Sequence, residues 1–417
     1  MEAYVVATAC TKFEKKPNQT FKSLTEEVYL DLLREAELEN GDLIGQAWFG
    51  NCGMGTFGQR NIRGQVCFTP LVNKKLFPER VGIINVEGGC ATGSMAFHGA
   101  WKDVVSGIED VSLAIGVEKI FQPDRPDMIQ EIYDGGIDQF DKDEWIKFYK
   151  DVGDQLGKPF NPEEKKGTIF MNTYGLQALW HMKKFGTTQK QIALAASKNH
   201  FHGSLNEKAQ YQFKVSVEDV LNDREISYPL TRSMCAPIGD GAAAALICSK
   251  KGLKFFTKEV QDRAIKIKSS VLTGGKYRTL DEPGLSRIAA QKAFKQADIT
   301  QKDIDILEIH DATSFCEIYQ LEMLGFCPEG KGGKFVEEGK TSLDGELPVN
   351  LSGGLVSKGH PVGATGLSMV HELSVQLKGE ATKRQSQRNK FALAENGGGV
   401  IGFEEAACSV IILESPF

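Results

Sequence analysis

The run Glu87-Gly88-Gly89-Cys90-Ala91-Thr92-Gly93 directly follows the apolar stretch 81–86 and precedes a helical pattern that begins near Met95. This order predicts a strand, a tight glycine turn and a helix, with Cys90 at the N-terminus of the helix. Unpaired amides and the helix dipole favour an anion there, so a thiol at this position loses its proton more readily and becomes a nucleophile. A buried cysteine that packs as a small apolar residue is the alternative.

Two glycine-rich blocks near the C-terminus supply a base that suits such a thiol. They read Asn350-Leu351-Ser352-Gly353-Gly354 and Gly359-His360-Pro361-Val362-Gly363-Ala364-Thr365-Gly366, and a helical pattern follows over 367–377. His360 therefore lies in a turn just before a helix, as Cys90 does. Imidazole commonly activates a thiol because its pKa lies near neutrality.

Two strand ends complete the set of candidate site residues. The apolar run 304–309 predicts a strand that ends in His310-Asp311-Ala312-Thr313-Ser314, and a helical stretch follows from Phe315. Polar residues at the end of a strand in an α/β protein commonly face a ligand crevice. The run Asn396-Gly397-Gly398-Gly399 precedes a strand at 407–413. Its three glycines let backbone amides approach a ligand and hold an oxyanion, and a simple tight turn is the alternative.

In this order, the four segments resemble the thiolase superfamily over nearly the whole chain. The Gly-His-Pro block at 359–361 is the most specific part of the resemblance. The N-terminal segment 5–13 and the pair His310-Asp311 resemble the sequences of one branch of the family. That branch comprises the sterol-carrier-protein-type thiolases and their bacterial and archaeal relatives. Segments 181–188 and 237–244 of the middle region resemble the same branch.

The resemblance implies an α/β chain with the thiolase fold, in which two similar α/β halves form a five-layer αβαβα core and carry a loop domain. The expected parts are 1–120 and 236–255 for the N-terminal half, 121–235 for the loop domain on the CoA-binding side, and 256–417 for the C-terminal half. Local patterns further predict a strand-like segment at 254–272.

The same resemblance implies acyl transfer through a cysteine. Cys90 would attack an acyl-CoA thioester, His360 would take the cysteine proton, and His310 with His360 would polarise the thioester oxygen of the second substrate. The amide of Cys90 and an amide from the turn Gly397, Gly398 and Gly399 would form the oxyanion hole. Substrate contacts are expected from a further set, Asn350, Ser352, Gly353, Ala312 and Cys316.

The chain departs from the family in one respect, because a second catalytic cysteine is missing. Classical thiolases carry it in the terminal glycine turn, which here reads Glu395-Asn396-Gly397, and sterol-carrier-type enzymes carry it where this chain has Ala312. Cys316, Glu395 and His310 are the candidate replacements. A buried packing role is favoured for Cys316, and a carboxylate at the core edge or surface for Glu395. Acyl transfer through Cys90 stays intact, whereas the usual proton shuttle at the α-carbon is removed.

Composition excludes several classes of function. The 417 residues carry a formal net charge of −6, and no basic stripe that would suit nucleic acid is present. No run of about 18 or more apolar residues occurs, so no membrane span is expected. Nine cysteines without Cys-x-x-Cys spacing indicate a reducing, cytoplasmic location, and no cluster has the spacing of a metal site. Two histidines of a polar stretch, His200 and His202, are expected in a solvated loop.

The expected function is thiolase-type cleavage of a 3-oxoacyl-CoA, or the reverse condensation, with coenzyme A as cosubstrate and no permanently bound cofactor. The aromatic middle segment and the missing cysteine fit a bulky or aromatic substrate such as benzoylsuccinyl-CoA. Resemblance to the branch implies a homodimer or tetramer and, as in some members, a small zinc-ribbon/OB-fold partner subunit. Two alternatives stay open: transfer of an acyl group to a non-CoA acceptor, and a non-catalytic protein that binds acyl-CoA.

Overall fold

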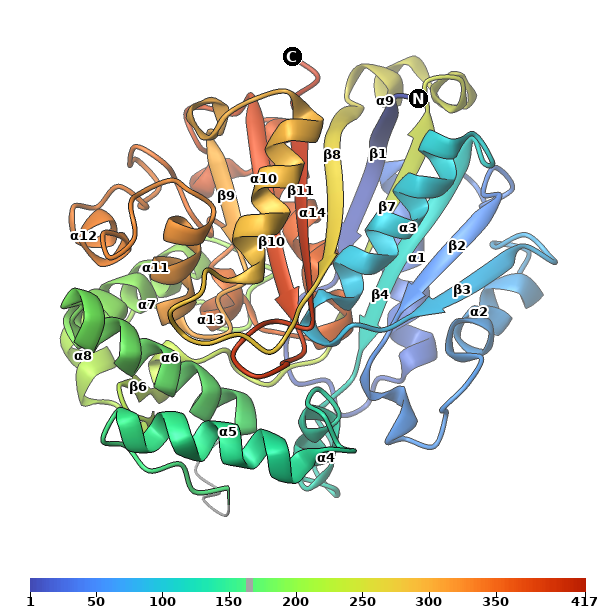
Figure 1. The fold of residues 1–417 in the computed structure, drawn as a ribbon. Helices are drawn as coiled ribbons and strands as arrows, with labels where there is room; N and C mark the ends of the chain where they lie inside the picture. Colours follow the sequence, from blue (N-terminus) through green and yellow to red (C-terminus); the bar gives the residue numbers. More distant parts are fainter. Residues whose placement is uncertain (163–167) are drawn as a thin grey trace.

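The computed structural model describes residues 1–162 and 168–417 and contains a nine-stranded mixed sheet of order β3-β2-β4-β7-β1-β8-β11-β10-β9 (Figure 1). The first five strands form an N-terminal half-sheet: β3 (Gly82–Val86), β2 (Gln46–Gly50), β4 (Val111–Glu118), β7 (Gly241–Ser249) and β1 (Ala3–Cys10). The last four form a C-terminal half-sheet: β8 (Ile265–Gly274), β11 (Ala407–Glu414), β10 (Phe391–Gly398) and β9 (Ile306–Ile309).

The two half-sheets repeat one pairing pattern. Strand β2 pairs parallel with β4, β4 antiparallel with β7, and β7 antiparallel with β1. Strands β9, β10, β11 and β8 repeat these orientations in the same order. Two residue pairs join the half-sheets, Tyr4 with Lys266 and Val5 with Ile265. Strand β3 is an additional edge strand, and the described part of the C-terminal half has no counterpart to it.

Three helical layers alternate with the two half-sheets. Helices α1 (Phe21–Glu35) and α2 (Arg63–Asn73) pack on the outer face of the N-terminal half-sheet. Helices α3 (Thr92–Ser106) and α14 (Thr365–Leu377) lie between the half-sheets, in an apolar cluster that contains strands of both. Helices α10 (Leu285–Ala297) and α11 (Ser314–Met323) cover the outer face of the C-terminal half-sheet. The predicted five-layer α/β architecture is confirmed.

Alternating side chains explain how a half-sheet is buried on both faces. In β10, Ala392 and Ala394 face the central helices, whereas Phe391 and Leu393 face the outer layer. Successive residues of a strand point to opposite faces, so a strand that is covered on both sides needs a continuous apolar run. The small alanines on the inner face let α14 approach the sheet closely.

A mostly helical region between β4 and β7 lies below the sheet in the view of Figure 1. Its elements are α4 (Met128–Asp134), α5 (Lys142–Gln155), α6 (Ile169–Phe185), α7 (Gln189–Gly203), α8 (Val217–Asn222), β5 (Glu225–Ser227) and β6 (Leu230–Thr231). Trp145 and Tyr149 build a separate aromatic cluster with Phe403 from the C-terminal half. The loop domain expected at 121–235 falls in this region. Its boundaries stay a prediction, and residues 163–167 lie outside the described residues.

The prediction of a strand over 254–272 is wrong for its first part. The single-turn helix η4 (Gly252–Phe255) and helix α9 (Lys258–Asp262) come before β8. The Thr257 side chain caps α9 by accepting a hydrogen bond from the amide of Val260 (3.4 Å). Such a cap satisfies an otherwise unpaired amide and favours a helix start over a strand.

The solvated loop expected around His200 and His202 is also wrong, because both residues lie buried in the last turn of α7. Main-chain carbonyls from elsewhere in the fold, those of Ser233 and Asn350, lie 3.3 Å and 3.0 Å from the two imidazoles. Burial of this polar segment cannot be predicted from the sequence, because the carbonyls that contact its histidines are distant in the chain.

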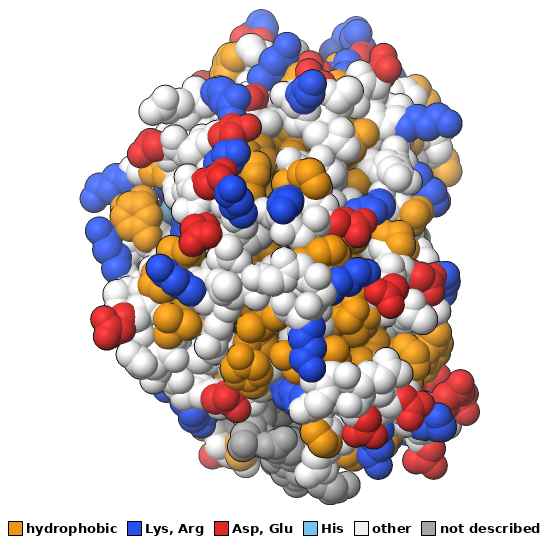
Figure 2. Space-filling view, turned by 60° about the vertical axis from the view of Figure 1, so that its left-hand side comes forward, with side chains coloured by type: hydrophobic (Ala, Val, Ile, Leu, Met, Phe, Trp, Pro, Cys, Tyr) orange, Lys and Arg blue, Asp and Glu red, His pale blue; other side chains and the backbone are white. Residues whose placement is uncertain are grey.

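Two further helices, α12 (Gly332–Glu337) and α13 (Gly354–Lys358), precede the central helix α14. On the face shown in Figure 2, Lys and Arg side chains are interspersed with Asp and Glu. Within residues 1–162 and 168–417, no helix combines the length and the apolar character needed to cross a membrane.

Candidate active site

Cys90 lies where the turn after β3 enters the central helix α3. The single-turn helix η2 (Gly89–Ala91) carries it, and α3 begins at Thr92. The Thr92 hydroxyl accepts a hydrogen bond from the Gly88 amide (2.9 Å) and donates one to the Gly89 carbonyl (2.6 Å), which fixes the turn. The strand, turn and helix predicted around Cys90 are therefore present.

His360 reaches the same point from the C-terminal half. It precedes the single-turn helix η6 (Val362–Ala364), and its Nε2 lies 3.0 Å from the Cys90 Sγ. Its Nδ1 lies 2.7 Å from Thr365 Oγ1, and that hydroxyl donates its proton to the Pro361 carbonyl (3.1 Å). Thr365 can then only accept from Nδ1–H, so Nε2 carries no proton and faces the thiol as an acceptor.

His310 completes the cluster from the end of β9. Its ring centroid lies 5.3 Å from that of His360, and one ligand atom from each of Cys90, His310 and His360 lies within 4.8 Å of the others. The His310 Nε2 is buried and has no hydrogen-bond partner among the described residues, so it is free to bond to a substrate. The same spacing would suit a metal ion; that the chain uses none stays a prediction.

Burial sets the protonation state of the cluster. It raises the pKa of the Cys90 thiol to about 12 and lowers the pKa of His310 to about 4. The pKa of His360 is held well below its usual value by burial, with help from the neighbouring His310. The expectation that the helix N-terminus lowers the thiol pKa is wrong, because desolvation of the thiolate outweighs the main-chain hydrogen bond that favours it. The thiol and both imidazoles are therefore neutral at pH 7.

The three glycines pack against the turn that holds Cys90. Gly397 and Gly398 end β10, and Gly399 follows them. A Cβ on Gly398 would lie 2.7 Å from the amide nitrogen of Cys90, and a Cβ on Gly89 would lie 2.5 Å from that of Gly399. Side chains are thus excluded at both contacts. Amides from the two turns lie close together beside the thiol, as an oxyanion hole requires.

No second thiol joins the cluster among the described residues. Ala312 and Cys316 are buried just beyond the end of β9, and burial raises the pKa of Cys316 to about 12. The Cys316 Sγ lies 3.5 Å from the hydroxyl of Thr313, a contact within its own helix start. Cys316 therefore has the surroundings of a packing residue.

Glu395 lies in the core, not at the core edge or surface as favoured from the sequence. It is fully buried in β10, and its carboxylate accepts a hydrogen bond from the main-chain amide of His310 (3.2 Å). Burial and the nearby Glu405 raise its pKa to about 8. Glu395 thus supports the backbone of His310 from outside the three-residue cluster.

The Asn350 block holds β9 in place. The Asn350 Oδ1 accepts a hydrogen bond from the Ile309 amide (2.7 Å), and the Ser352 hydroxyl donates to Glu308 (2.7 Å). Both side chains are buried, and neither they nor Gly353 line the two cavities described next. These bonds position the strand that ends in His310, and they leave the expected substrate contacts without support.

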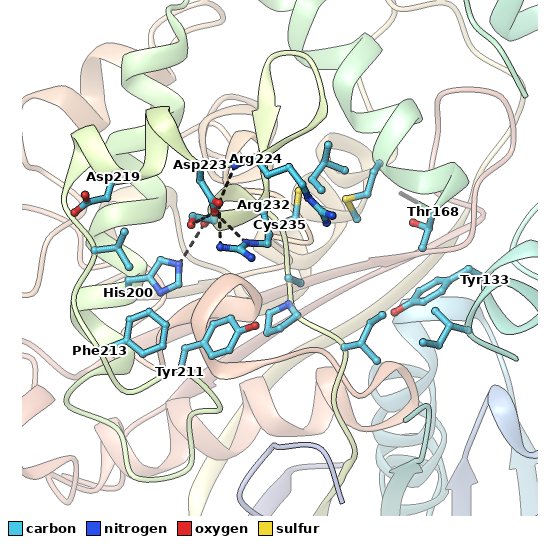
Figure 3. A pocket seen from close by; sticks show the side chains of 18 of the residues that line it. Tyr133, Thr168, His200, Tyr211, Phe213, Asp219, Asp223, Arg224, Arg232 and Cys235 are labelled. Atoms are coloured by element: carbon cyan, nitrogen blue, oxygen red, sulfur yellow. Dashed lines mark hydrogen bonds and ion pairs between the residues drawn. The ribbon is translucent and has the colours of Figure 1, made fainter. Parts of the chain in front are cut away.

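A cavity of about 320 Å³ lies beside Cys90. Its apolar wall is formed by Ile132, Tyr133, Phe170 and Val362. A second, larger cavity of about 850 Å³ lies between α7, α8 and the segment 232–238 (Figure 3). Tyr133 lines both cavities, so the larger cavity adjoins the one beside the thiol.

The wall of the larger cavity combines aromatic rings with guanidinium groups (Figure 3). The His200 ring lies 5.8 Å from that of Phe213 and 6.1 Å from that of Tyr211, and it is nearly parallel to both. Arg232 forms an ion pair with Asp223 (3.0 Å). Arg224 also lines the cavity and has no carboxylate partner among the described residues.

Glu118 is a buried residue at the end of β4 that was not predicted to matter. Its carboxylate accepts hydrogen bonds from the amides of Cys52, Gly53 and Gly363 and from the Asn51 side chain, each at 3.0–3.1 Å. It ties the loop after β2 to the loop that carries His360. Burial raises its pKa to about 7 against the effect of these bonds. A polar residue that ends an apolar strand is the signal that pointed to His310, and it applies to Glu118 as well.

Comparison with known proteins finds matches to two family models and to curated proteins along nearly the whole chain. A model of the thiolase N-terminal domain matches residues 3–220, and a model described as thiolase C-terminal domain-like matches residues 282–414. The chain is 33% identical to the acetyl-CoA acetyltransferase of Methanothermobacter thermautotrophicus over 408 residues, which cover 95% of this chain and 96% of that protein. It is 33% identical to sterol carrier protein 2 of Bos taurus, over 97% of this chain and 73% of that protein.

More distant likenesses agree with this placement. The benzoylsuccinyl-CoA thiolase subunit BbsB of Thauera aromatica is 28% identical over 91% of this chain and 90% of its own length. A solved structure described as an Ltp2-ChsH2(DUF35) aldolase shares the fold, with a TM-score of 0.76 at 20% identity over 100% of this chain and 98% of that chain. The resemblance drawn from the motifs is confirmed: the chain belongs to the thiolase family and is an acyltransferase.

Proposed function

We propose that this chain cleaves a 3-oxoacyl-CoA with coenzyme A, or runs the reverse condensation, through an acyl group on Cys90. The proposal rests on the 3.0 Å contact between the Cys90 Sγ and the His360 Nε2, with the unpaired Nε2 of His310 beside it. A nucleophile, a base and a second imidazole converge from two halves of the chain, which is the arrangement that covalent acyl transfer needs.

In the first half-reaction the Cys90 sulfur attacks the 3-oxo carbon while the thiol proton passes to His360. The amide of Cys90 and an amide of the turn 397–399 hold the oxyanion. The bond between C2 and C3 breaks, and its electron pair forms an enolate on the departing acyl-CoA. The proton released by Cys90 is delivered to C2, which leaves an acyl-Cys90. In the second half-reaction the coenzyme A sulfur attacks this thioester, and its proton returns through His360 to the Cys90 sulfur.

We assign the proton transfer at C2 to His310, in place of the missing cysteine. Its Nε2 is the unpaired atom of the cluster, whereas Cys316 and Glu395 lie outside the 4.8 Å group. In the cleavage direction His360 passes the Cys90 proton to the Nε2 of His310, which delivers it to C2. In the condensation direction the neutral His310 takes the C2 proton and the transfers run in reverse. Glu395 then acts on this step indirectly, through the backbone of His310.

The larger cavity is the place we assign to coenzyme A, as a cosubstrate that leaves after turnover. Arg224 and Arg232 offer guanidinium groups to its phosphates, and the wall of His200, Tyr211 and Phe213 offers rings for its adenine (Figure 3). Tyr133 joins this cavity to the one beside Cys90. A thioester at the end of the pantetheine arm can therefore meet the thiol.

A bulky acyl group suits the cavity of about 320 Å³ beside Cys90, whose wall includes Tyr133 and Phe170. The relative from Thauera aromatica is named a benzoylsuccinyl-CoA thiolase subunit, and benzoylsuccinyl-CoA is the aromatic substrate we would test first. The name of the solved aldolase includes a DUF35 protein beside the thiolase-fold chain, which supports a small partner subunit here too. A homodimer or tetramer is the assembly we expect around it.

The missing second cysteine supports one rival, transfer of the acyl group to an acceptor other than coenzyme A. That rival predicts an acyl-Cys90 that coenzyme A does not discharge. The other rival, a non-catalytic binding protein, predicts no adduct at all, and the close contact of Cys90 with His360 argues against it.

Incubation with a panel of aliphatic and aromatic acyl-CoA thioesters, followed by intact mass and peptide mapping, tests the proposal. An adduct on the Cys90 peptide that coenzyme A releases as acyl-CoA is the expected result. It should disappear in Cys90→Ser and persist in Cys327→Ser, a partly buried free thiol that lines neither cavity. Failure to form an adduct with any thioester, alone or with a co-expressed DUF35-type subunit, would overturn it.

A further inference from the structure

Two arginines line the cavity beside Cys90 without a carboxylate partner. Arg60 and Arg63 belong to its wall, and neither forms an ion pair within the part of the chain that the structure describes. Half-buried or buried guanidinium groups elsewhere are neutralised; Arg384, for example, forms a bidentate pair with Glu372. Unpaired guanidinium groups in a cavity wall indicate an anionic ligand.

Arg63 is held in position without being neutralised. Its Nη1 donates to the main-chain carbonyl of Asn51 (2.5 Å). Asn51 is itself buried, and its side-chain amide donates to the Val117 carbonyl (2.8 Å) and to Glu118 (3.0 Å). The guanidinium therefore has a preset place, and it keeps its charge and its remaining N–H groups for a ligand.

Among the described residues, Glu87 is the acidic member of this wall, and it does not cancel the two arginines. Glu87 is exposed, and its carboxylate accepts a hydrogen bond from the Gly89 amide (2.7 Å) in the turn before Cys90. The described part of the wall thus holds two guanidinium groups and one carboxylate that is already bonded to the Gly89 amide, which leaves an excess of positive charge beside the apolar side chains.

We propose that this cavity binds an acyl group that carries a free carboxylate, so that the substrates are CoA thioesters of dicarboxylic acids. The inference rests on the proposed function, because the acyl group must reach Cys90. Ile132 and Phe170 contact the carbon skeleton, and Arg63 with Arg60 takes the carboxylate. A plain fatty acyl group would displace water from both guanidinium groups and leave them unpaired, which disfavours it.

The phosphates of coenzyme A are a second source of negative charge, and the test separates the two sources. Succinyl-CoA and butyryl-CoA have acyl chains of equal length and differ in the terminal carboxylate. Both are titrated calorimetrically into Cys90→Ala, so that no acyl transfer occurs. We expect succinyl-CoA to bind at least about tenfold more tightly, the effect of one charge-assisted contact.

Arg63→Gln should bring the ratio of the two Kd values close to one by weakening succinyl-CoA alone. Arg60→Gln, at an exposed position where folding is not at risk, should lower the ratio by a smaller factor. Arg80→Gln is the matched control, since Arg80 is exposed, has no carboxylate partner among the described residues and lines neither cavity. It should leave the ratio unchanged.

Equal affinity for the two thioesters, or a preference that survives both Arg63→Gln and Arg60→Gln, would overturn the inference. Equal weakening of both thioesters by Arg63→Gln would assign the guanidinium to a CoA phosphate and overturn it as well. The proposed function is tested separately, by measuring thiolysis of 3-oxoacyl-CoA substrates with and without a terminal carboxylate. Absence of turnover and of acyl-Cys90, with the Arg63-dependent preference intact, would defeat the proposed function and keep the carboxylate site.

Discussion

The N-terminal and C-terminal halves use one scaffold for different chemistry. In each half a glycine-rich turn enters a central helix, α3 or α14, and carries a member of the candidate active site, Cys90 in one and His360 in the other. The halves share their strand pairing, but β3 occurs only in the N-terminal one within the described residues. The C-terminal half instead supplies a second imidazole, His310. Neither turn holds both Cys90 and His360, so the proposed reactive centre exists only where the halves meet.

Cys90→Ser removes the reactive atom of the N-terminal half and should have the largest effect. A serine keeps the size of the side chain, but its hydroxyl is a far weaker acid that His360 cannot activate in the same way. We expect kcat for thiolysis of a 3-oxoacyl-CoA to fall by at least about 10⁴-fold. Cys327→Ser should retain wild-type kcat. Turnover of Cys90→Ser within tenfold of wild type would rule out the acyl-cysteine route.

His360→Gln breaks the contribution of the C-terminal half while it leaves the thiol in place. Loss of the base should slow acylation of Cys90 by about 10³-fold, measured in single turnovers by rapid quench. His371→Gln, in the helix α14 that follows the His360 turn, is the control, since the His371 Nδ1 lies 3.0 Å from the Thr8 hydroxyl and away from the cluster. A loss smaller than tenfold in His360→Gln would show that His310 alone suffices as the base.

Each half also holds a histidine whose pKa burial lowers to about 4, the partly buried His98 in α3 and the buried His310 after β9. Between that value and the unfolded pKa near 6.5, the unfolded chain binds the extra protons. The free energy of unfolding should therefore be fully present above pH 6.5 and fall as the pH drops toward 4, by up to about 3 kcal/mol for each histidine. His98→Gln and His310→Gln should each flatten this decline in urea titrations. An unchanged slope in both variants would contradict the lowered pKa values of these histidines.

Glu395 changes the free energy of unfolding with pH in the direction opposite to the histidines, so its contribution must be measured separately. With a pKa of about 8 in the folded state, it holds a proton that the unfolded chain releases above about pH 4.5. Its contribution to stability is lost as the pH rises through 8. Glu395→Gln should therefore gain stability relative to wild type at pH 9 and show little difference at pH 5.

Much of this arrangement could be predicted, because the signals are local. Glycine turns and polar strand ends pointed to Cys90, His310 and His360, and the structure brings all three within 4.8 Å. The failures come from burial. The helix start at Cys90 predicts a low thiol pKa, but desolvation raises it, and no sequence pattern reports how much water reaches the sulfur.

Residues whose roles depend on which strands are neighbours could not be predicted either, because their contacts come from segments that are distant in the sequence. Glu118 bonds to Asn51 and Gly363 only because β4 lies beside β2 and beneath the His360 loop. Arg63 becomes part of the site because its helix begins beside that same network. The polar sequence around His200 predicts a solvated loop, because the Ser233 carbonyl that lies beside its imidazole is distant in the chain.

The N-caps of the outer helices differ between the two halves, and changing them should have the smallest effect of these variants. α1 follows the first strand of its half and is capped by Thr20, whose hydroxyl accepts from the Ser23 amide (3.1 Å). α10 follows the first strand of the other half, and its N-cap is Gly284, without a side-chain bond. Thr20→Ala should lower the free energy of unfolding by about 1 kcal/mol in urea titrations.

Gly284→Ser would introduce a preferred capping residue at the equivalent place, yet we expect no gain. A Cβ there would lie 2.7 Å from the hydroxyl of Tyr319, which is held by a hydrogen bond from Arg278 (3.1 Å). Either Tyr319 moves away from Arg278 or the helix start shifts, and both costs oppose the new cap. A stabilised Gly284→Ser would show that this neighbour yields easily and that local helix signals outweigh packing in the C-terminal half. A destabilised one would show that the shape of the surrounding layer, rather than the helix start itself, decides which of two equivalent helices can be capped.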